Sequence, residues 1–357
     1  MNTLAQLLKN ARQKSGLKLR EAAAIAQMDA ALLSKFENGQ RLPPEDQAPA
    51  LAKAYHLDEA SLRRSILAEK VAVLLQYETG VHELLMVAES RIEYLRSERS
   101  LILPEIPGVL MDKLIAIDAL KTTWQACKPM NKSQLERMRQ YFHTEYTFES
   151  NRIEGNTLTL QETSLVINEG LTISGKTMRE HLEAVNHADA VAFITELATQ
   201  QADLDRRTLL DLHNLILRGV DSENAGRYRS VPVRIGGSRH EPPQPYLLDK
   251  LMEDYFIHYR QQRDTLHPVL LAADMHERLV SIHPFIDGNG RTSRLVMNLI
   301  LLRNGYTIAN LKGDPNSRLA YYRALEKVQA DNEPEHFYTL VADAVETSLK
   351  AHIELAG

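Results

Sequence analysis

The chain has 357 residues, of which 44% are hydrophobic and 25% are charged, and its net charge is -5. This length is enough for two or three domains with separate cores, and 16 Gly and 14 Pro exclude a collagen-like or low-complexity chain. No stretch reaches the roughly 20 apolar residues of a membrane span, and the first residues lack a secretory signal. We therefore expect a cytoplasmic protein without membrane contact. The single cysteine, Cys127, excludes an internal disulfide, and we expect a buried structural thiol there.

The first 65 residues have the pattern of short helices. Two helical patterns precede Asp29, which would cap a helix over residues 30–37, and Asn38-Gly39 would end that helix. These 65 residues carry ten Lys/Arg against seven Asp/Glu, a charge of +3 against -8 for the remainder. The asymmetry weakly favours contact with nucleic acid. We expect a separate helical domain over residues 1–65.

Within this domain, residues 16–39 (GLKLREAAAIAQMDAALLSKFENG) resemble the Cro/C1-type helix-turn-helix, whose second helix lies in the DNA major groove. The resemblance implies that Ser34, Lys35 and Arg41 face DNA phosphates, which position a domain without reading its sequence. However, two alanines stand where the family places polar residues at the start of the recognition helix. The alternative is a helical module used for dimerisation or for docking of a target.

Residues 66–108 are expected to form a helical linker, with apolar residues at helical spacing and an interruption at Gly80. We expect this apolar stripe to pack against a core rather than to form the seam of a homodimer, which stays an alternative. The stripe consists of Leu74, Val81, Leu85, Ala88, Ile92 and Leu95.

Helical patterns dominate residues 109–357, with one exception. Residues 231–235 alternate between apolar and polar, Gly236-Gly237 follows, and a pair of prolines closes the segment. This pattern is typical of a β-hairpin.

The segment HPFIDGNGRTSR, residues 283–294, has the residues for chemistry on a nucleotide. Its two glycines let the backbone approach a ligand, and a turn that leads into a helix directs free N–H groups at an anion. Two arginines and an asparagine add donors for a polyphosphate, and Asp287 can hold the magnesium ion that accompanies a nucleoside triphosphate. His283 can take the proton of an attacking hydroxyl. The segment therefore predicts nucleotidyl or phosphoryl transfer.

The same segment matches every position of HxFx(D/E)GNGRxxR, and the chain resembles the Fic family over roughly residues 132–331, most fully its animal-type enzymes. The resemblance implies a mainly α fold: an all-helical Fic core with a small β-hairpin flap, preceded by the helix-turn-helix. It also implies transfer of AMP from ATP, with Mg²⁺, to a hydroxyl of a target protein or of the chain itself. The intact Asp287-Gly288 argues against the phosphate-transferring Doc branch.

The resemblance assigns a role to each matching residue. His283 would be the general base, Asp287 the metal ligand, and Phe285 an inward-packing residue. ATP would be bound by Gly288, Asn289, Gly290, Arg291 and Arg294, with Tyr321 or Tyr322 beside the adenine. The flap that aligns the target segment would be Val233, Arg234, Ile235, Gly236 and Gly237.

Upstream, Ser150 and Glu154 are four residues apart and share one helix face just before Gly155. Beside a Fic core this pair, on a helix near residues 145–155, resembles the inhibitory motif (S/T)xxxE(G/N). The resemblance implies that Glu154 pairs with Arg294 in the place of the γ-phosphate, so that activity is low at rest. The same glutamate could orient a water that removes AMP. The rival interpretation is a DNA-binding transcription regulator in which the Fic fold senses a nucleotide.

Overall fold

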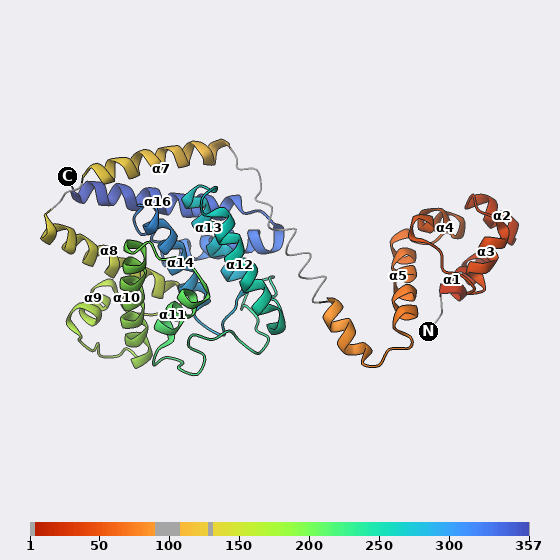
Figure 1. The fold of residues 1–357 in the computed structure, drawn as a ribbon, viewed down its shortest axis with the longest axis horizontal. Coiled ribbons are helices and arrows are strands. Elements are labelled where there is room, and N and C mark those ends of the chain that lie inside the picture. Colours follow the sequence, from red (N-terminus) through yellow and green to blue (C-terminus); the bar gives the residue numbers. More distant parts are fainter. Residues whose placement is uncertain (1–3, 90–107, 128–130, 357) are drawn as a thin grey trace. The chain divides into compact units, whose positions relative to one another are not determined.

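The computed structural model describes residues 4–89, 108–127 and 131–356. The chain divides into two compact units, Met1–Glu89 and Ser90–Gly357. The regular structure of the described residues is helical in both units, which confirms the expected mainly α class (Figure 1). None of the described helices is both long and apolar enough to cross a membrane.

The N-terminal unit begins with the short helices that the sequence predicts. Asp29 caps the third of them, because its Oδ1 accepts hydrogen bonds from the backbone N–H groups of Ala31 (2.8 Å) and Leu32 (3.2 Å). Gly39, with φ +70°, follows that helix in the left-handed conformation expected from the sequence. The elements are α1 (Leu4–Lys14), α2 (Leu19–Ile25), α3 (Ala30–Glu37), the 3₁₀ turn η1 (Glu45–Gln47), α4 (Ala48–Tyr55) and α5 (Glu59–Leu75).

This unit has a core of its own, built from apolar side chains of α1 to α5, such as Leu8, Phe36 and Leu51. A buried polar contact joins three of its helices. Arg12 of α1 donates to both carboxylate oxygens of Glu37 at the end of α3, and the hydroxyl of Tyr55 in α4 donates to the same carboxylate. The helix-turn-helix is therefore fixed by its own contacts.

The apolar stripe of the predicted linker does not pack against a core in the described residues. Leu74 is 76% exposed and Leu85 is 44% exposed, and Ala88 is also exposed. Ile92 and Leu95 lie outside the described residues. Residues 81–89 are helical, as the pattern predicted.

The C-terminal unit is a helical bundle around one apolar helix. Its elements are α7 (Gly108–Ala126), α8 (Lys132–Ile153), α9 (Leu160–Glu169), α10 (Met178–Thr199), α11 (Arg206–Leu217), the 3₁₀ turn η2 (Pro245–Leu247), α12 (Leu248–Gln262), α13 (Pro268–Ile282), α14 (Asn289–Arg303), α15 (Pro315–Glu326), the π-helical turn η3 (Lys327–Asp331) and α16 (Glu335–Ala356). α14 is buried on all sides, as its apolar run LVMNLILL dictates, and it packs against α13, α10 and α11. α7 lies along α16 (Figure 1). Cys127, just after α7, is a free thiol that is partly buried and packs against the core, whereas we expected a buried thiol.

The β-hairpin predicted over residues 231–235 is not formed: this segment carries no strand. Its two arms are instead joined through the side chain of Arg229. The Arg229 guanidinium donates to the carbonyl oxygen of Val231 (3.0 Å) on one arm and to that of Pro243 (2.5 Å) on the other. Because a buried side chain takes these carbonyl groups, alternation of apolar residues alone overpredicted a ladder of paired strands.

Candidate active site

The segment between α13 and α14 is held in an unusual backbone conformation. His283 ends α13 with φ +50°, which is uncommon for a residue other than glycine, and Gly288 precedes α14 with φ +79°. Arg229 fixes the first of these positions, because its Nε donates to the carbonyl oxygen of His283 at 2.8 Å. The loop therefore leads directly into the N-terminus of α14, whose first N–H groups have no partner within the helix.

Asn289 shapes the loop with its side chain. Its Oδ1 accepts from the backbone N–H of Phe285 (3.0 Å), and its Nδ2 donates to the carbonyl oxygen of Phe285 (2.8 Å). The side chain is buried and both of its polar atoms are used within the loop. As a predicted phosphate donor, Asn289 therefore has only its backbone N–H, at the first position of α14, left for a ligand.

His213 of α11 supports the loop, although nothing in the sequence pointed to this residue. Its ring stacks on Phe285 at 3.6 Å between centroids, and Phe285 is fully buried, as expected. The Nδ1 atom accepts from the backbone N–H of Gly226 (3.0 Å), so Nε2 carries the proton and donates to the carbonyl oxygen of Asp287 (3.0 Å). Burial lowers the pKa of His213 to about 4, which keeps this tautomer neutral. A Cβ atom at Gly288 would touch the His213 ring at 3.4 Å.

His283 is oriented as a proton acceptor. Its Nδ1 lies 3.2 Å from the carbonyl oxygen of Val280, which can only accept, so Nδ1 carries the proton and the lone pair is on Nε2. Burial lowers the pKa of His283, and the positive charge of Arg229 lowers it further. The imidazole is therefore neutral near pH 7, as a general base must be.

Arg294 is fully buried and all of its nitrogens have partners. Its Nε donates to the hydroxyl of Ser150 (3.0 Å), and one terminal nitrogen donates to the Ser150 carbonyl (2.9 Å) and to Glu154 Oε1 (2.7 Å). The other terminal nitrogen lies 3.4 Å from the hydroxyl of Tyr321. Burial alone lowers the pKa of Arg294, but the charge of Glu154 outweighs it and raises the pKa. The residues predicted as inhibitory thus contact the predicted γ-phosphate ligand.

Glu154 itself lies at the edge of the site. It follows the last residue of α8, and 33% of its side-chain surface is exposed. A Cβ atom at Gly290 would collide with Glu154 Oε1, so this carboxylate lies against the first turn of α14. A negative charge there occupies the place where the helix N-terminus attracts anions.

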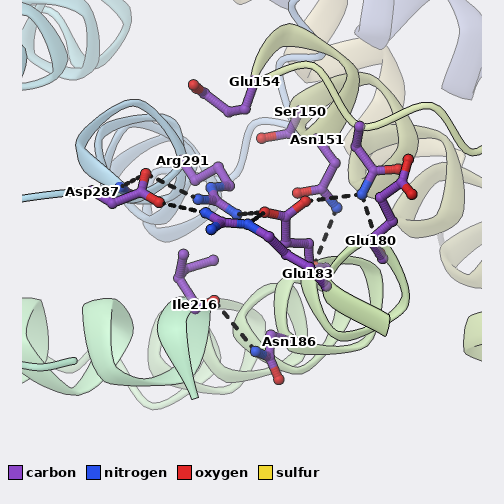
Figure 2. A network of polar contacts seen from close by, with 12 residues as sticks. Ser150, Asn151, Glu154, Glu180, Glu183, Asn186, Ile216, Asp287 and Arg291 are labelled. Atoms are coloured by element: carbon purple, nitrogen blue, oxygen red, sulfur yellow. Dashed lines mark hydrogen bonds and ion pairs between the residues drawn. The ribbon is translucent and has the colours of Figure 1, made fainter. Parts of the chain in front are cut away.

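Asp287 faces a group of charged side chains from α10 and α14 (Figure 2). Its Oδ2 accepts from Arg179 (2.8 Å), and its Oδ1 accepts from the backbone N–H of Gly288 (2.6 Å) and lies 3.4 Å from Arg291. Arg291 is buried and lies 3.5 Å from Glu183. Burial raises the pKa of Asp287, but Arg291 and the other donors outweigh burial and lower it, so this carboxylate is charged.

A carboxylate oxygen is a fitting ligand for Mg²⁺, although the described residues contain no group of three or more His, Cys, Asp or Glu side chains placed for a metal. Asp287 is such an oxygen donor and is partly exposed at the mouth of the loop. Mg²⁺ commonly takes most of its ligands from substrate phosphates and water, so a single carboxylate fits an ion that arrives with ATP.

The two tyrosines predicted near the adenine lie on α15 in different environments. Tyr321 is buried beneath Arg294, whereas Tyr322 is 41% exposed and donates to the carbonyl oxygen of Ile153 (3.2 Å). The flap residues lie at the surface: Val233 and Ile235 are partly buried, and Arg234, Gly236 and Gly237 are exposed.

In the helix-turn-helix, the residues predicted to face DNA are exposed or partly so. Lys35 and Arg41 are exposed, and Ser34 is partly buried on α3, where its hydroxyl accepts from Asn38 (3.3 Å). The backbone N–H of Arg41 donates to the Lys35 carbonyl (3.3 Å), which joins the backbones of the two residues.

Fold and site together define an all-helical domain whose glycine loop, at a helix N-terminus, lies between a neutral histidine and a buried arginine. Residues 203–301 match the Fic/DOC family model, and residues 3–64 match a helix-turn-helix domain model. The chain therefore carries a Fic/DOC-family domain behind a helix-turn-helix domain, as the sequence predicted.

Curated relatives are protein adenylyltransferases named Fic. The protein from Drosophila grimshawi is 35% identical over 243 residues, which is 68% of this chain and 49% of the relative. The protein from Drosophila melanogaster is 34% identical over 242 residues, 68% of this chain and 48% of the relative. The chain thus spans about half the length of the curated relatives it matches.

Solved structures share the fold. A Fic-domain signaling protein from Bacteroides thetaiotaomicron is 27% identical with a TM-score of 0.61, covering 67% of this chain and 97% of that one. Fic-1 from C. elegans has a TM-score of 0.63 at 24% identity, covering 99% of this chain and 98% of that one, and shows the fold alone.

Proposed function

We propose that the protein is an adenylyltransferase that transfers AMP from ATP to a hydroxyl side chain of a protein, and that Glu154 restrains this activity. The names of the curated relatives support the reaction. The observation that carries the regulatory part is the contact of buried Arg294 with Glu154 at 2.7 Å, beside the glycine loop. Acceptors on the chain itself belong to the same proposal.

In the proposed reaction the triphosphate binds over the N-terminus of α14. His283 Nε2 takes the proton of the acceptor hydroxyl, the hydroxyl oxygen forms a bond to the α-phosphorus, and the bond from that phosphorus to the bridging oxygen breaks. Pyrophosphate leaves with the electron pair of that bond. Buried Arg291 and the N–H groups of the loop face the developing negative charge, where a site away from water makes them effective.

Asp287 would hold the Mg²⁺ that accompanies ATP, and the ion would supply positive charge to the phosphates. The side chains of His213 and Asn289 take no part in the chemistry, because their polar atoms are bonded to Gly226 and to the loop itself. Their role is to keep the loop in place before ATP arrives.

Glu154 restrains the reaction by occupying the guanidinium that would bind the γ-phosphate. A charge-assisted hydrogen bond of this kind contributes about 1.5–3 kcal/mol, so releasing it before ATP can bind productively lowers the rate by roughly 10- to 100-fold. Because a third of its side chain is exposed, Glu154 can leave Arg294 without disruption of the core. Exposure also lets water reach Glu154, and removal of AMP by a water bonded to this carboxylate is a second reaction that we propose for the same site.

The test of the reaction is labelling of protein by ATP that carries label on the α-phosphate or on the γ-phosphate. We expect Glu154→Gly to increase labelling from the α position, and Glu154→Gln, which keeps the shape without the charge, to increase it less. Adding His283→Ala to Glu154→Gly should abolish the label. Labelling from the γ position alone means phosphate transfer, and labelling that survives His283→Ala contradicts the proposed base.

A second proposal concerns the N-terminal unit: it binds the phosphates of DNA through Lys35 and Arg41, which are both exposed and are joined by a backbone hydrogen bond. The rival function, a DNA-binding regulator with the Fic domain as nucleotide sensor, also requires this binding of DNA. Affinity for random-sequence DNA should fall steeply with salt and should drop when both residues are changed to Gln. Equal affinity of the variant and the native protein at low salt would leave docking of a protein partner as the role of this unit.

A further inference from the structure

The predicted metal ligand Asp287 already has a cation as its partner. Arg179, in the first turn of α10, donates from a terminal nitrogen to Asp287 Oδ2 at 2.8 Å. The second arginine near this carboxylate, Arg291, is farther away, at 3.4 Å from Oδ1. Arg179 therefore holds the oxygen that is least used by the loop itself, since Oδ1 also accepts from the Gly288 N–H.

Arg179 has a second partner to which it stays attached. Its Nε donates to Glu183 Oε1 at 3.0 Å, one helical turn further along α10. Glu183 is largely buried, with 11% of its side chain exposed, and it also faces Arg291. Figure 2 shows Glu183 between Arg291 and Asn151, with Asp287 on the far side of Arg291. The contact with Asp287 can therefore break while the contact with Glu183 holds the arginine nearby.

The same glutamate connects this group to the segment after the inhibitory residue. Asn156, two residues beyond Glu154, donates to Glu183 Oε2 (3.0 Å) and to the carbonyl oxygen of Glu180 (3.1 Å). Glu183 is thus held by contacts on both sides, so it keeps its position as the second partner of Arg179.

The ion pair between Arg179 and Asp287 is weak enough to break. The side chain of Arg179 is 57% exposed and that of Asp287 is 40% exposed, so water and salt screen their attraction. A divalent cation carries twice the charge of the guanidinium and competes for the same oxygen.

We propose, building on the ATP-dependent function above, that Arg179 is a placeholder cation for the metal position. It neutralises Asp287 while no metal is bound, and it withdraws onto Glu183 when ATP arrives with its metal ion. When ATP arrives without a metal ion, Arg179 still occupies Asp287 Oδ2. Arg179 therefore controls how strongly ATP binding depends on the metal ion.

The test measures binding rather than turnover. The full chain with Glu154→Gly and His283→Ala, which leaves Arg294 free and removes the base, is titrated with ATP by calorimetry, first with a chelator and then at increasing Mg²⁺. Adding Arg179→Gln should lower the Mg²⁺ concentration of half-maximal effect by about two- to five-fold, which is the range for loss of one exposed ion pair. Formation of the Mg²⁺–ATP complex in solution is the same for every variant and cancels in the comparison.

Arg206→Gln is the matched control. Arg206 is also 57% exposed and is paired with a carboxylate, Asp249, at 2.7 Å, but it lies at the start of α11 away from the loop. The Arg206→Gln substitution removes the same charge and should leave the Mg²⁺ dependence of ATP binding unchanged.

Three other results overturn the placeholder. An unchanged Mg²⁺ dependence in Arg179→Gln means that the arginine only stabilises α10, and an equal shift in Arg206→Gln means a general charge effect. Weaker binding of ATP by Arg179→Gln at saturating Mg²⁺, where the placeholder has withdrawn, means that Arg179 contacts the nucleotide. If no variant binds ATP at all, the proposed function is itself wrong, whereas ATP binding with unchanged metal dependence contradicts the placeholder alone.

Discussion

Each unit of the protein contains an arginine that pairs with a glutamate distant in the chain, Arg12 at 16% and Arg294 at 1% exposure of the side chain, and the two pairs differ in the glutamate. In the N-terminal unit, both oxygens of Glu37 are bonded to Arg12, at 2.8 Å each, and Tyr55 adds a bond at 2.7 Å. Only 4% of the Glu37 side chain is exposed. In the C-terminal unit, Arg294 is buried but Glu154 is 33% exposed and takes a single bond from it.

This difference separates a structural ion pair from a removable one. Removal of a buried carboxylate leaves its partners without a counterion and without water in its place, which is costly. A carboxylate at the solvent edge can leave because water replaces it. Residue types and hydrogen-bond lengths are alike in the two pairs, so the burial of the carboxylate and the number of its bonds separate the two roles.

The largest expected effect is on the structural pair. Glu37→Ala should lower the free energy of unfolding of the N-terminal unit by about 3 kcal/mol, because Arg12 and the Tyr55 hydroxyl lose their partner at a position that is closed to water. Hydrogen exchange of α3 and α4 in the full chain measures this loss, and Tyr55→Phe, which removes one bond, should cost about 1 kcal/mol. A loss below that of Tyr55→Phe would place Glu37 with the removable carboxylates.

A smaller loss is expected for the removable pair. Glu154→Ala should cost about 1 kcal/mol of unfolding free energy, since one bond is lost and water can take its place. Trp124, the only tryptophan of the chain, lies in the C-terminal unit, so its fluorescence during denaturation reports on this unit alone. A loss as large as that of Glu37→Ala would mean that Glu154 is a structural residue and cannot leave Arg294 to relieve the proposed restraint.

A still smaller loss of unfolding free energy is expected for an ion pair that is exposed on both sides. Arg218 donates to Asp189 at 2.6 Å, and about half of each side chain is exposed. Arg218→Gln should change the unfolding free energy by less than about 0.5 kcal/mol in the same denaturation experiment. A loss comparable to that of Glu154→Ala would show that exposure does not separate these pairs.

The smallest expected effect is on pH dependence near neutrality. His283 acts as a base when neutral, and burial lowers its pKa below 6.5. As the pH falls from about 7.5 to 6.5, labelling by the Glu154→Gly variant should fall less than about two-fold, because more than half of the imidazole stays unprotonated. The loss should become steep only at lower pH. An acid limb with its midpoint above pH 7 would contradict the described environment of His283.

The sequence predicted those features whose residues lie close together in the chain. The capped helix after Asp29, the loop of residues 283–294 and the facing of Ser150 and Glu154 are set by local spacing, and the structure has each of them. The family motif supplied the pairing of Glu154 with Arg294, which are 140 residues apart, because spacing alone cannot bring such positions together.

The sequence did not predict contacts that depend on packing. His213 and Arg179 come from α11 and α10, and nothing in their local sequence indicates that they reach Asp287. The hairpin over residues 231–235 was wrong for a related reason, since the guanidinium of Arg229 takes the carbonyl groups that strand pairing would need. Likewise, the exposed Leu74 shows that helical periodicity identifies an apolar face without identifying what covers it.

The central claim is that Arg294 is contested between Glu154 and the γ-phosphate of ATP. It is tested most directly by the affinities of ATP and ADP, measured by calorimetry on the inactive His283→Ala protein with and without Glu154→Gly. Removal of Glu154 should strengthen ATP binding by about ten-fold and leave ADP binding nearly unchanged, because only ATP has the phosphate that Arg294 would bind. An equal gain for ATP and ADP, or no gain for ATP, would contradict the account.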